Sequence, residues 1–253
     1  CYWSSDVCSS DLDGVFLYGN KAKDNLISKG IPENKLYPIY NSLNYREQKN
    51  IRERNLSNKT NIVFPISDDK KKIFQLVFVG RLTKQKKLDM LIDLVNSLEQ
   101  RGIIVNLLFI GDGSERESLE KYVRSFNSLA NRVVFYGECY REDILSSLIM
   151  ESDVCISPGA IGLTAMHVLG YGTPVITHDD EFSQMPEYEA IVDGYTGRFF
   201  KKGSLSSLVD VVHDYIENPI ENVSQNCIKM IENKYTPEVQ KVLIEKALHE
   251  IID

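Results

Sequence analysis

The residues of this chain best suited to chemistry lie in one glycine-led stretch of its second half. The stretch runs from Ser157 to His178 as SPGAIGLTAMHVLGYGTPVITH, and within it the sequence predicts a helix over 163–171. The backbone N–H groups of Gly162, Leu163 and Thr164 would point out of the start of this helix, where the helix dipole is positive. Such a start binds phosphates, although a tight strand–helix turn without a ligand accounts for the same residues about equally well.

Two cationic side chains are predicted at the same edge. Arg81 directly follows an apolar strand that ends at Gly80, and Lys86 lies five residues later. A guanidinium binds phosphate in a bidentate manner, and an ammonium adds a point charge. Solvated surface loops are the ordinary place of such residues. Because both would share one sheet edge with the helix start, the sequence favours a diphosphate site made of the two cations and the three amides.

The elements that position these residues alternate between strand and helix. Continuous apolar runs predict strands at 76–79, 103–110, 133–136, 154–157 and 174–177. The segments between them have apolar residues at helical spacing, which predicts helices. This order predicts an α/β fold with a Rossmann-like, doubly wound parallel sheet that helices cover on both faces. Ligands of such sheets bind outside the carboxyl ends of the strands, which selects the loops at 80–82, 111–113, 137–141 and 158–164.

Two further helix ends are predicted. A helix from Ser114 to about 127 should have Ser114 as its N-cap, with Glu117 completing a capping box. Near the start of the chain, a short strand at 13–18 precedes a helix at 21–29, which Gly30 should end.

Composition and motifs disfavour several classes of function. The net charge of −7 argues against nucleic-acid binding, and no apolar run reaches the roughly 20 residues of a membrane span. The lysines at 70–72 and 84–87, apart from Lys86, are expected in solvated loops. Gly111-Asp112-Gly113 does not continue as G-x-G-x-x-G, because Arg116 stands at the last position, and no P-loop motif is present.

Cysteine usage indicates a reducing compartment. Outside the first twelve residues, the cysteines are Cys139, Cys155 and Cys227. Their odd number and the lack of C-x-x-C spacing predict free thiols in a cytoplasmic protein rather than disulfides or zinc. The first twelve residues are aperiodic and rich in Cys and Ser. Residues 6–12 also match a translated sequencing adapter, so the segment 1–12 is expected to be no part of the fold.

Several motifs together resemble a known family. VFVGRLTKQKKLDMLI, LLFIGDGSERESL, VVFYGECYREDI, DVCISPGAIGLTAMHVLGYGTPVITH and DGYTGRFF occur in this order. Their order and spacing resemble the C-terminal, donor-binding domain of GT-B glycosyltransferases, most closely the GT4-like group that builds bacterial polysaccharides. FLYGNKAKDNLISKGIPENKLYPIYNSLNY resembles the end of that family's N-terminal domain. The resemblance implies an acceptor-domain end at 13–44, a linker at 45–72, a donor domain at 73–235 and a C-terminal helix at 236–253, with the N-terminal half mostly missing.

The resemblance also implies an activity and a site. The activity is sugar transfer from a nucleotide-diphosphate donor to a glycan or lipid-linked acceptor, retaining and without a metal or other cofactor, by a cytoplasmic protein that is membrane-peripheral at most. Arg81, Lys86 and the amides of 162–164 would bind the diphosphate. The nucleoside would lie against the remaining candidates, which are Gly80, Gly111, Gly113, Cys139, Tyr140, Arg141 and His167. The chain alone is expected to bind the donor but to catalyse sugar transfer poorly. The catalytic residues on the acceptor side are unknown.

Two positions depart from the family pattern. The family has two glutamates spaced E-x7-E across this loop and helix, the first touching the donor sugar and the second the ribose. Gly159 and His167 stand at these positions here. His167 can still bind a ribose hydroxyl through a ring nitrogen, or simply pack as a half-buried helix residue. Gly159 leaves the sugar without a side-chain contact from this position.

Other assignments stay open. Glu187 and Glu189 could contact the nucleotide or cap a local turn, and His178 could face the cleft or end a strand. Two rival functions are a non-catalytic sugar-nucleotide-binding module, which the lost glutamates allow, and a GT-B-fold sugar-nucleotide epimerase, which would need acid/base carboxylates in the cleft.

Overall fold

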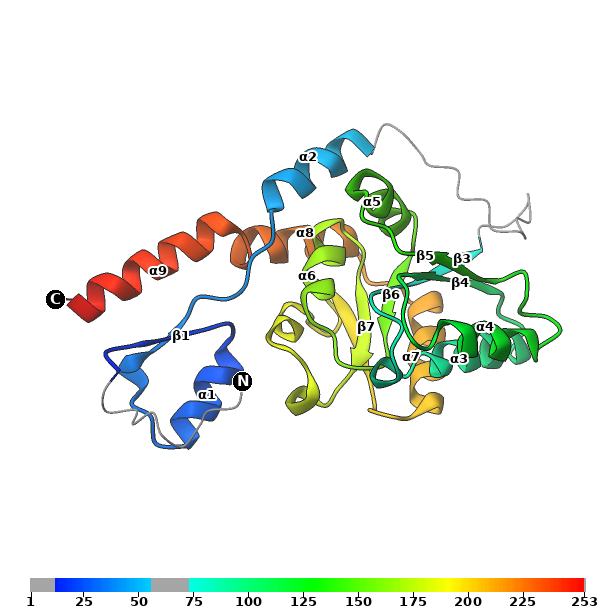
Figure 1. The fold of residues 1–253 in the computed structure, drawn as a ribbon, viewed down its shortest axis with the longest axis horizontal. Coiled ribbons are helices and arrows are strands. Elements are labelled where there is room, and N and C mark those ends of the chain that lie inside the picture. Colours follow the sequence, from blue (N-terminus) through cyan, green and yellow to red (C-terminus); the bar gives the residue numbers. More distant parts are fainter. Residues whose placement is uncertain (1–11, 56–72, 253) are drawn as a thin grey trace.

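The structure of the protein is a computed structural model that describes residues 12–55 and 73–252. Almost all of the predicted adapter segment, the lysines at 70–72 and residues 56–72 of the predicted linker lie outside the described residues. Figure 1 shows a larger part built around one sheet and a smaller part that contains the first strands and helix.

The larger part is built on a six-stranded, all-parallel sheet. Its strand order is β5-β4-β3-β6-β7-β8. The strands are β3 (Phe74–Val79), β4 (Val105–Ile110), β5 (Val133–Gly137), β6 (Val154–Ser157), β7 (Val175–His178) and β8 (Gly197–Phe200). Numbered from β3, this is the 3-2-1-4-5-6 order of a doubly wound sheet, so the predicted fold class is confirmed. The order reverses between β3 and β6, and a ligand crevice is expected outside their carboxyl ends.

Helices cover both faces of the sheet because strand side chains alternate between them (Figure 1). Leu76 and Phe78 of β3 lie on one face, in a core with α3 (Asp89–Gln100), α4 (Arg116–Arg124) and α7 (Leu205–Glu217). Val77 lies on the other face, in a core with α2 (Tyr45–Asn55), α5 (Glu142–Met150), α6 (Leu163–Gly170) and α8 (Val223–Lys234). Burial on both faces explains why these strands appear in the sequence as continuous apolar runs.

The predicted capping box at α4 is wrong. The helix begins at Arg116 rather than Ser114, its N-cap is Glu115, and no side chain caps it among the described residues. The cause is a tertiary contact, since the Glu115 N–H donates to the Leu82 carbonyl at 3.0 Å and the Arg116 N–H to the Gly113 carbonyl at 3.1 Å. The chain therefore enters α4 through a turn that is held by the β3–α3 loop.

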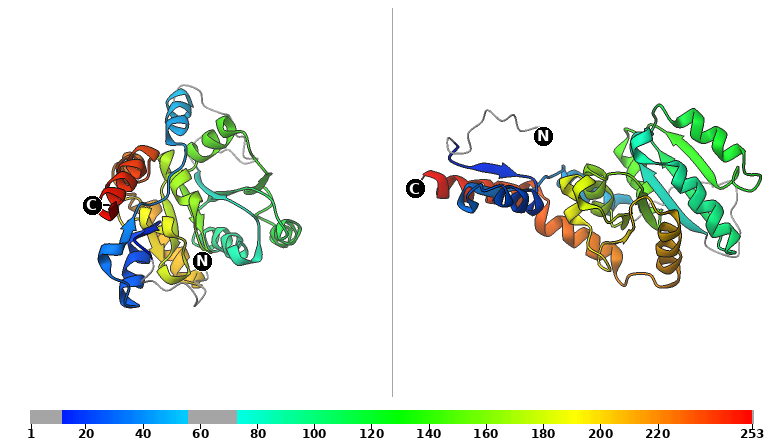
Figure 2. Two further views of the ribbon diagram at one scale, coloured as in Figure 1. Left: turned by 60° about the vertical axis from the view of Figure 1, so that its left-hand side comes forward. Right: turned by 90° about the horizontal axis from the view of Figure 1, so that it is seen from below.

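The smaller part joins the first and last described residues. β1 (Val15–Leu17) pairs in parallel with β2 (Leu36–Pro38), and α1 (Asn20–Ser28) connects them. Gly30, with φ +87°, directly follows the C-cap residue Lys29 and ends this helix, as predicted. The C-terminal helix α9 (Pro237–Ile252) leaves the larger part and returns beside this pair of strands, as Figure 2 shows in its right-hand view.

Candidate functional site

The loops that follow β3 and β6 meet at the switch point of the sheet. Arg81 is exposed directly after β3, and Lys86 is half-buried at the end of the short 3-10 helix η3 (Lys84–Lys86). The Lys86 Nζ donates a hydrogen bond of 2.5 Å to the carbonyl of Ala160, in the loop after β6. The predicted neighbourhood of Lys86 and the glycine-led loop is therefore present in the fold.

Gly159 makes this contact possible. A Cβ on Gly159 would lie 2.5 Å from the Gln85 carbonyl oxygen and 2.8 Å from the Lys86 Cα, closer than side-chain carbons approach other atoms. Only glycine lets the two loops pack together at this point. A glutamate at position 159 would separate them, which gives a structural reason for its absence here.

The start of α6 lies beside the Lys86 contact. Gly162 is the N-cap residue, and no side chain of the described residues caps it. Gln184 fixes the approach to the helix, because its Oε1 accepts a hydrogen bond of 2.7 Å from the Ile161 N–H. Its Nε2 is held at Thr177 Oγ1 and at the His178 carbonyl, at 3.1 Å each. The predicted cradle at 162–164 is thus anchored to the end of β7.

The two cations of the site influence one another. Burial lowers the pKa of Lys86, and the positive charge of Arg81 lowers it further. Two cations that interact in this way are stabilised by an anion, and a diphosphate carries the complementary charge. The arrangement can therefore bind a phosphorylated ligand with a guanidinium, an ammonium and a helix start.

The glycines of the β4–α4 loop have a structural explanation. Gly111 has φ +136°, and a Cβ on it would lie 2.0 Å from the Gly80 carbonyl oxygen. Gly113 has φ +158°, and its Cβ would lie 2.4 Å from the Leu82 carbonyl oxygen. Close packing against the β3–α3 loop requires both glycines, and their contact with a nucleoside stays a prediction.

The β5–α5 loop is open on its outer side. The Tyr140 side chain is 86% exposed, and Cys139 is half-buried. Arg141 pairs with Asp143 at 2.7 Å, where both side chains are largely exposed. The loop is accessible to a base, and its predicted role is likewise untested.

His167 contacts Glu142, a residue outside the predicted site. Its Nε2 lies 2.6 Å from Oε1 of Glu142, the first residue of α5. The Tyr171 hydroxyl donates to the same oxygen at 2.5 Å. The signal available in the sequence was the position of Glu142 directly after a predicted ligand loop. Its contact with His167, 25 positions later, can be seen only in the folded structure.

The structure places the three residues whose assignments the sequence leaves open. Glu189 accepts hydrogen bonds from the Asn20 and Lys21 N–H groups at 3.1 and 2.8 Å, so it caps α1. Glu187 Oε1 accepts from Asn41 Nδ2 at 2.8 Å. His178, the last residue of β7, is 2% exposed, lies edge-on to Phe200 and has its ring nitrogens 3.2 Å from Nε2 of Gln184. Glu189 and one oxygen of Glu187 thus hold Asn20, Lys21 and Asn41. The second oxygen of Glu187 is buried beside the start of α6, 3.7 Å from where a Cβ on Gly162 would lie, and has no hydrogen-bond partner among the described residues.

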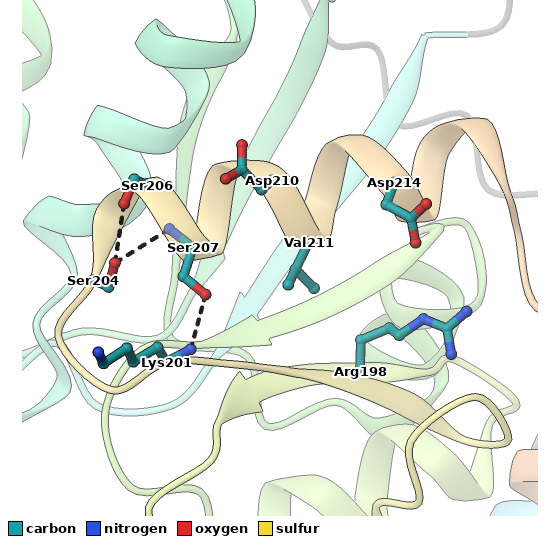
Figure 3. A pocket seen from close by; sticks show the side chains of 8 residues that line it. All are labelled: Arg198, Lys201, Ser204, Ser206, Ser207, Asp210, Val211 and Asp214. Atoms are coloured by element: carbon teal, nitrogen blue, oxygen red, sulfur yellow. Dashed lines mark hydrogen bonds between the residues drawn. The ribbon is translucent and has the colours of Figure 1, made fainter.

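Two surface hollows lie away from the switch point. One, of about 560 Å³, lies between β8 and the first turns of α7 (Figure 3). Two of its serine hydroxyls already form local hydrogen bonds. The Ser204 Oγ accepts from the Ser207 N–H at 3.2 Å, and the Ser207 Oγ accepts from the Lys201 N–H at 3.0 Å. The other, of about 500 Å³, lies between α1 and the segment at 188–193. Neither contains the convergent cations of the switch point.

Neither a metal-binding cluster nor a membrane-spanning helix occurs among the described residues. Within 12–55 and 73–252, no cluster of three or more His, Cys, Asp or Glu side chains is arranged to hold a metal ion. No helix of the same residues is long and apolar enough to span a membrane.

Known structures share this fold. The apo form of a lipopolysaccharide outer core galactosyltransferase superposes with a TM-score of 0.72 at 20% identity, over 94% of this chain and 62% of the other. An Anabaena protein solved in complex with UDP superposes with a TM-score of 0.69 at 18% identity, over 94% of this chain and 64% of the other.

Sequence relatives agree with the structural ones. A protein of the cps region of Klebsiella pneumoniae is 26% identical over 212 residues, 83% of this chain and 53% of its own length. A glycosyltransferase of Methanocaldococcus jannaschii is 33% identical over 152 residues, 57% of this chain and 36% of its own length. The chain thus spans about half or less of each relative. The profile of the family Glycosyl transferases group 1 matches residues 59–236, most of the chain, and the chain therefore belongs to that family.

Proposed function

We propose that this chain binds a nucleotide-diphosphate sugar at the switch point between β3 and β6, as the donor half of a glycosyltransferase. The observation that supports this most directly is the contact between Lys86 and the Ala160 carbonyl, at 2.5 Å. It brings Lys86, which also senses the charge of Arg81, to the loop that leads into α6. Family membership supports sugar transfer as the reaction.

The proposed mechanism is electrostatic. Arg81 and Lys86 bind the diphosphate, and the amides of 162–164 bind its phosphate nearest the sugar. When the sugar is transferred, the bond between its anomeric carbon and the diphosphate oxygen breaks, and negative charge develops on that oxygen. Fixed donors stabilise this charge without reorganising, which is the largest contribution in many enzymes. Because the cations and helix dipole supply the positive charge, the proposal includes no metal.

The acceptor is proposed to be a glycan or a lipid-linked glycan, in bacterial polysaccharide synthesis, with retention at the anomeric carbon. The support is the resemblance to the GT4-like group and the relative from a Klebsiella cps region. The buried free thiols Cys155 and Cys227 support a reducing, cytoplasmic location.

Calorimetry on a matched pair of variants tests donor binding. Lys86→Ala should weaken the binding of UDP or GDP by about tenfold or more, since a charge-assisted hydrogen bond is lost. Lys84→Ala removes an exposed lysine from the same short helix and should leave the affinity nearly unchanged. Equal affinities of the two variants would contradict the proposed diphosphate site.

Sugar transfer itself is tested with a longer chain that includes a complete acceptor-binding half, against a panel of nucleotide sugars. Transfer to a glycan or lipid-linked acceptor supports the proposal. Epimer formation, or binding without turnover, would favour one of the two rival functions.

A further inference from the structure

A polar cluster connects the first turn of α5 with α6. It consists of Glu142, His167 and Tyr171, and His167 and Tyr171 both contact Oε1 of Glu142, at 2.6 and 2.5 Å. The two rings lie edge to face, with centroids 5.4 Å apart and an interplanar angle of 78°. Two partners on one carboxylate oxygen fix the orientation of the whole group.

The second oxygen of Glu142 is available to a ligand. Oε2 makes no hydrogen bond to another residue in the described part of the chain, and the Glu142 side chain is 31% exposed. An ionised carboxylate accepts hydrogen bonds on both oxygens. Glu142 is thus held on one side and free to accept hydroxyl hydrogens on the other.

The charge state suits this role. Burial raises the pKa of Glu142, but the hydrogen bond and charge of His167 and the Tyr171 hydroxyl outweigh it and hold the net pKa below its ordinary value. Burial and the neighbouring Glu142 raise the pKa of Tyr171, so its hydroxyl stays a donor. At neutral pH the cluster therefore presents a carboxylate, which is the stronger acceptor.

The position of the cluster selects one part of a nucleotide. Along α6, His167 lies four residues beyond Leu163, which corresponds to about 6 Å of helix rise. A phosphate at the helix start would have its pentose at about this distance. The open loop at 138–141 directly precedes Glu142 and would lie beside the base. A hydroxyl-accepting group between a phosphate site and a base site would lie level with the sugar of the nucleoside.

We propose that Glu142 binds the 2′,3′-diol of the donor's ribose, with Tyr171 and His167 as its positioning residues. This inference rests on the proposed function and narrows its substrate class. The donor should be a ribonucleoside diphosphate sugar, discriminated from donors that carry 2′-deoxyribose. The carboxylate comes from α5, a different helix from the one that provides the amides.

Calorimetry with modified nucleotides tests the assignment. The probes are UDP and GDP, each with its 2′-deoxy and 3′-deoxy analogues. For the unmodified nucleotide, Glu142→Gln should lose about tenfold or more in affinity, as expected for a hydrogen bond to a charged group. For both deoxy analogues, the same substitution should lower the affinity much less, because these nucleotides already lack part of the interaction that it removes.

Two companion variants separate hydroxyl recognition from general damage. Glu117→Gln removes an exposed carboxylate from the first turn of α4, at the same edge of the sheet, and should change no affinity. Tyr171→Phe keeps the Glu142 carboxylate but removes one of the two hydrogen bonds that orient it. It should reduce the preference for ribose over deoxyribose, but less than Glu142→Gln does. If Glu142→Gln does not fold, Tyr171→Phe still tests the assignment.

The outcomes distinguish the two proposals. Equal binding of the unmodified and deoxy nucleotides by the wild type overturns the role of Glu142 and leaves donor binding intact. So does a loss in Glu142→Gln that is the same for all analogues, which would be a structural effect. Failure of the wild type to bind any nucleoside diphosphate overturns the proposed function, and this inference with it.

Discussion

A single methyl group added at Gly159 should separate the two loops of the candidate site. In Gly159→Ala the new Cβ would lie 2.5 Å from the Gln85 carbonyl oxygen and 2.8 Å from the Lys86 Cα. Favourable contacts between carbons are about 3.5–4.0 Å, so the β3–α3 loop must move by about 1 Å. Gly159 does not have a positive φ, and the alanine backbone is therefore unstrained. Any effect comes from the collision.

The expected magnitudes follow from this collision. Overpacking costs about 1–3 kcal/mol of unfolding free energy. With a urea m-value of about 3 kcal/mol/M, the unfolding midpoint should fall by about 0.3–1 M. The displaced Lys86 would also lose its charge-assisted contact with a phosphate, worth about 1.5–3 kcal/mol, so UDP or GDP affinity should fall by about tenfold or more.

Gly102→Ala is the matched control. Its new Cβ meets no atom within 4 Å, but the residue has φ +78°. Left-handed strain alone should cost about 1–2 kcal/mol of stability. The control thus loses stability without losing nucleotide affinity, when urea unfolding and calorimetry are measured on both variants. An unchanged midpoint and an unchanged affinity in Gly159→Ala would refute the close contact between the loops.

Three further outcomes are expected. Burial raises the pKa of Cys155 and of Cys227 to about 12, so iodoacetamide at pH 8 should label Cys139 in the folded protein while sparing both, as mapped by mass spectrometry. Because the pKa of Glu142 is lower in the fold than its ordinary 4.5, its stabilising contribution is present above about pH 4.5 and is lost as the pH falls through the folded pKa. The urea midpoints of wild type and Glu142→Gln should therefore converge as the pH falls below 4.5, and a constant difference would contradict the His167 and Tyr171 contacts. His167→Glu should weaken UDP or GDP binding by calorimetry, because two carboxylates would meet, and adding Glu142→Gln should restore part of the loss.

The sheet could be predicted from the sequence because its strands are buried on both faces. Continuous apolar runs such as 76–79 have few alternatives, and the loops at their ends follow from the fold class. β8 was not predicted. It has four residues, Gly197–Phe200, and a Cβ on Gly197 would lie 1.9 Å from the Val175 carbonyl oxygen, so its first residue must be glycine. A short strand that begins with glycine carries little strand signal.

The site was predictable to the extent that sheet topology determines it. Topology brings the residues after β3 and β6 together, and the contact between Lys86 and Ala160 follows. Contacts between side chains of different helices do not follow from topology. Gln184, which anchors Ile161, and Glu142, which contacts His167, were missed because nothing in their local sequence marks a partner more than 20 positions away.

The two departures from the family's glutamate pattern each have a cause in the neighbouring chain. At position 159 the cause is steric, because the backbone of Gln85 and Lys86 occupies the space that a side chain would need. At position 167 the cause is electrostatic, because Glu142 already places a carboxylate 2.6 Å from the ring of His167. A glutamate there would put two like charges in contact and raise the pKa of one of them. The histidine at 167 and the glutamate at 142 are therefore best understood as one paired arrangement, in which the first residue of α5 provides the carboxylate that contacts α6.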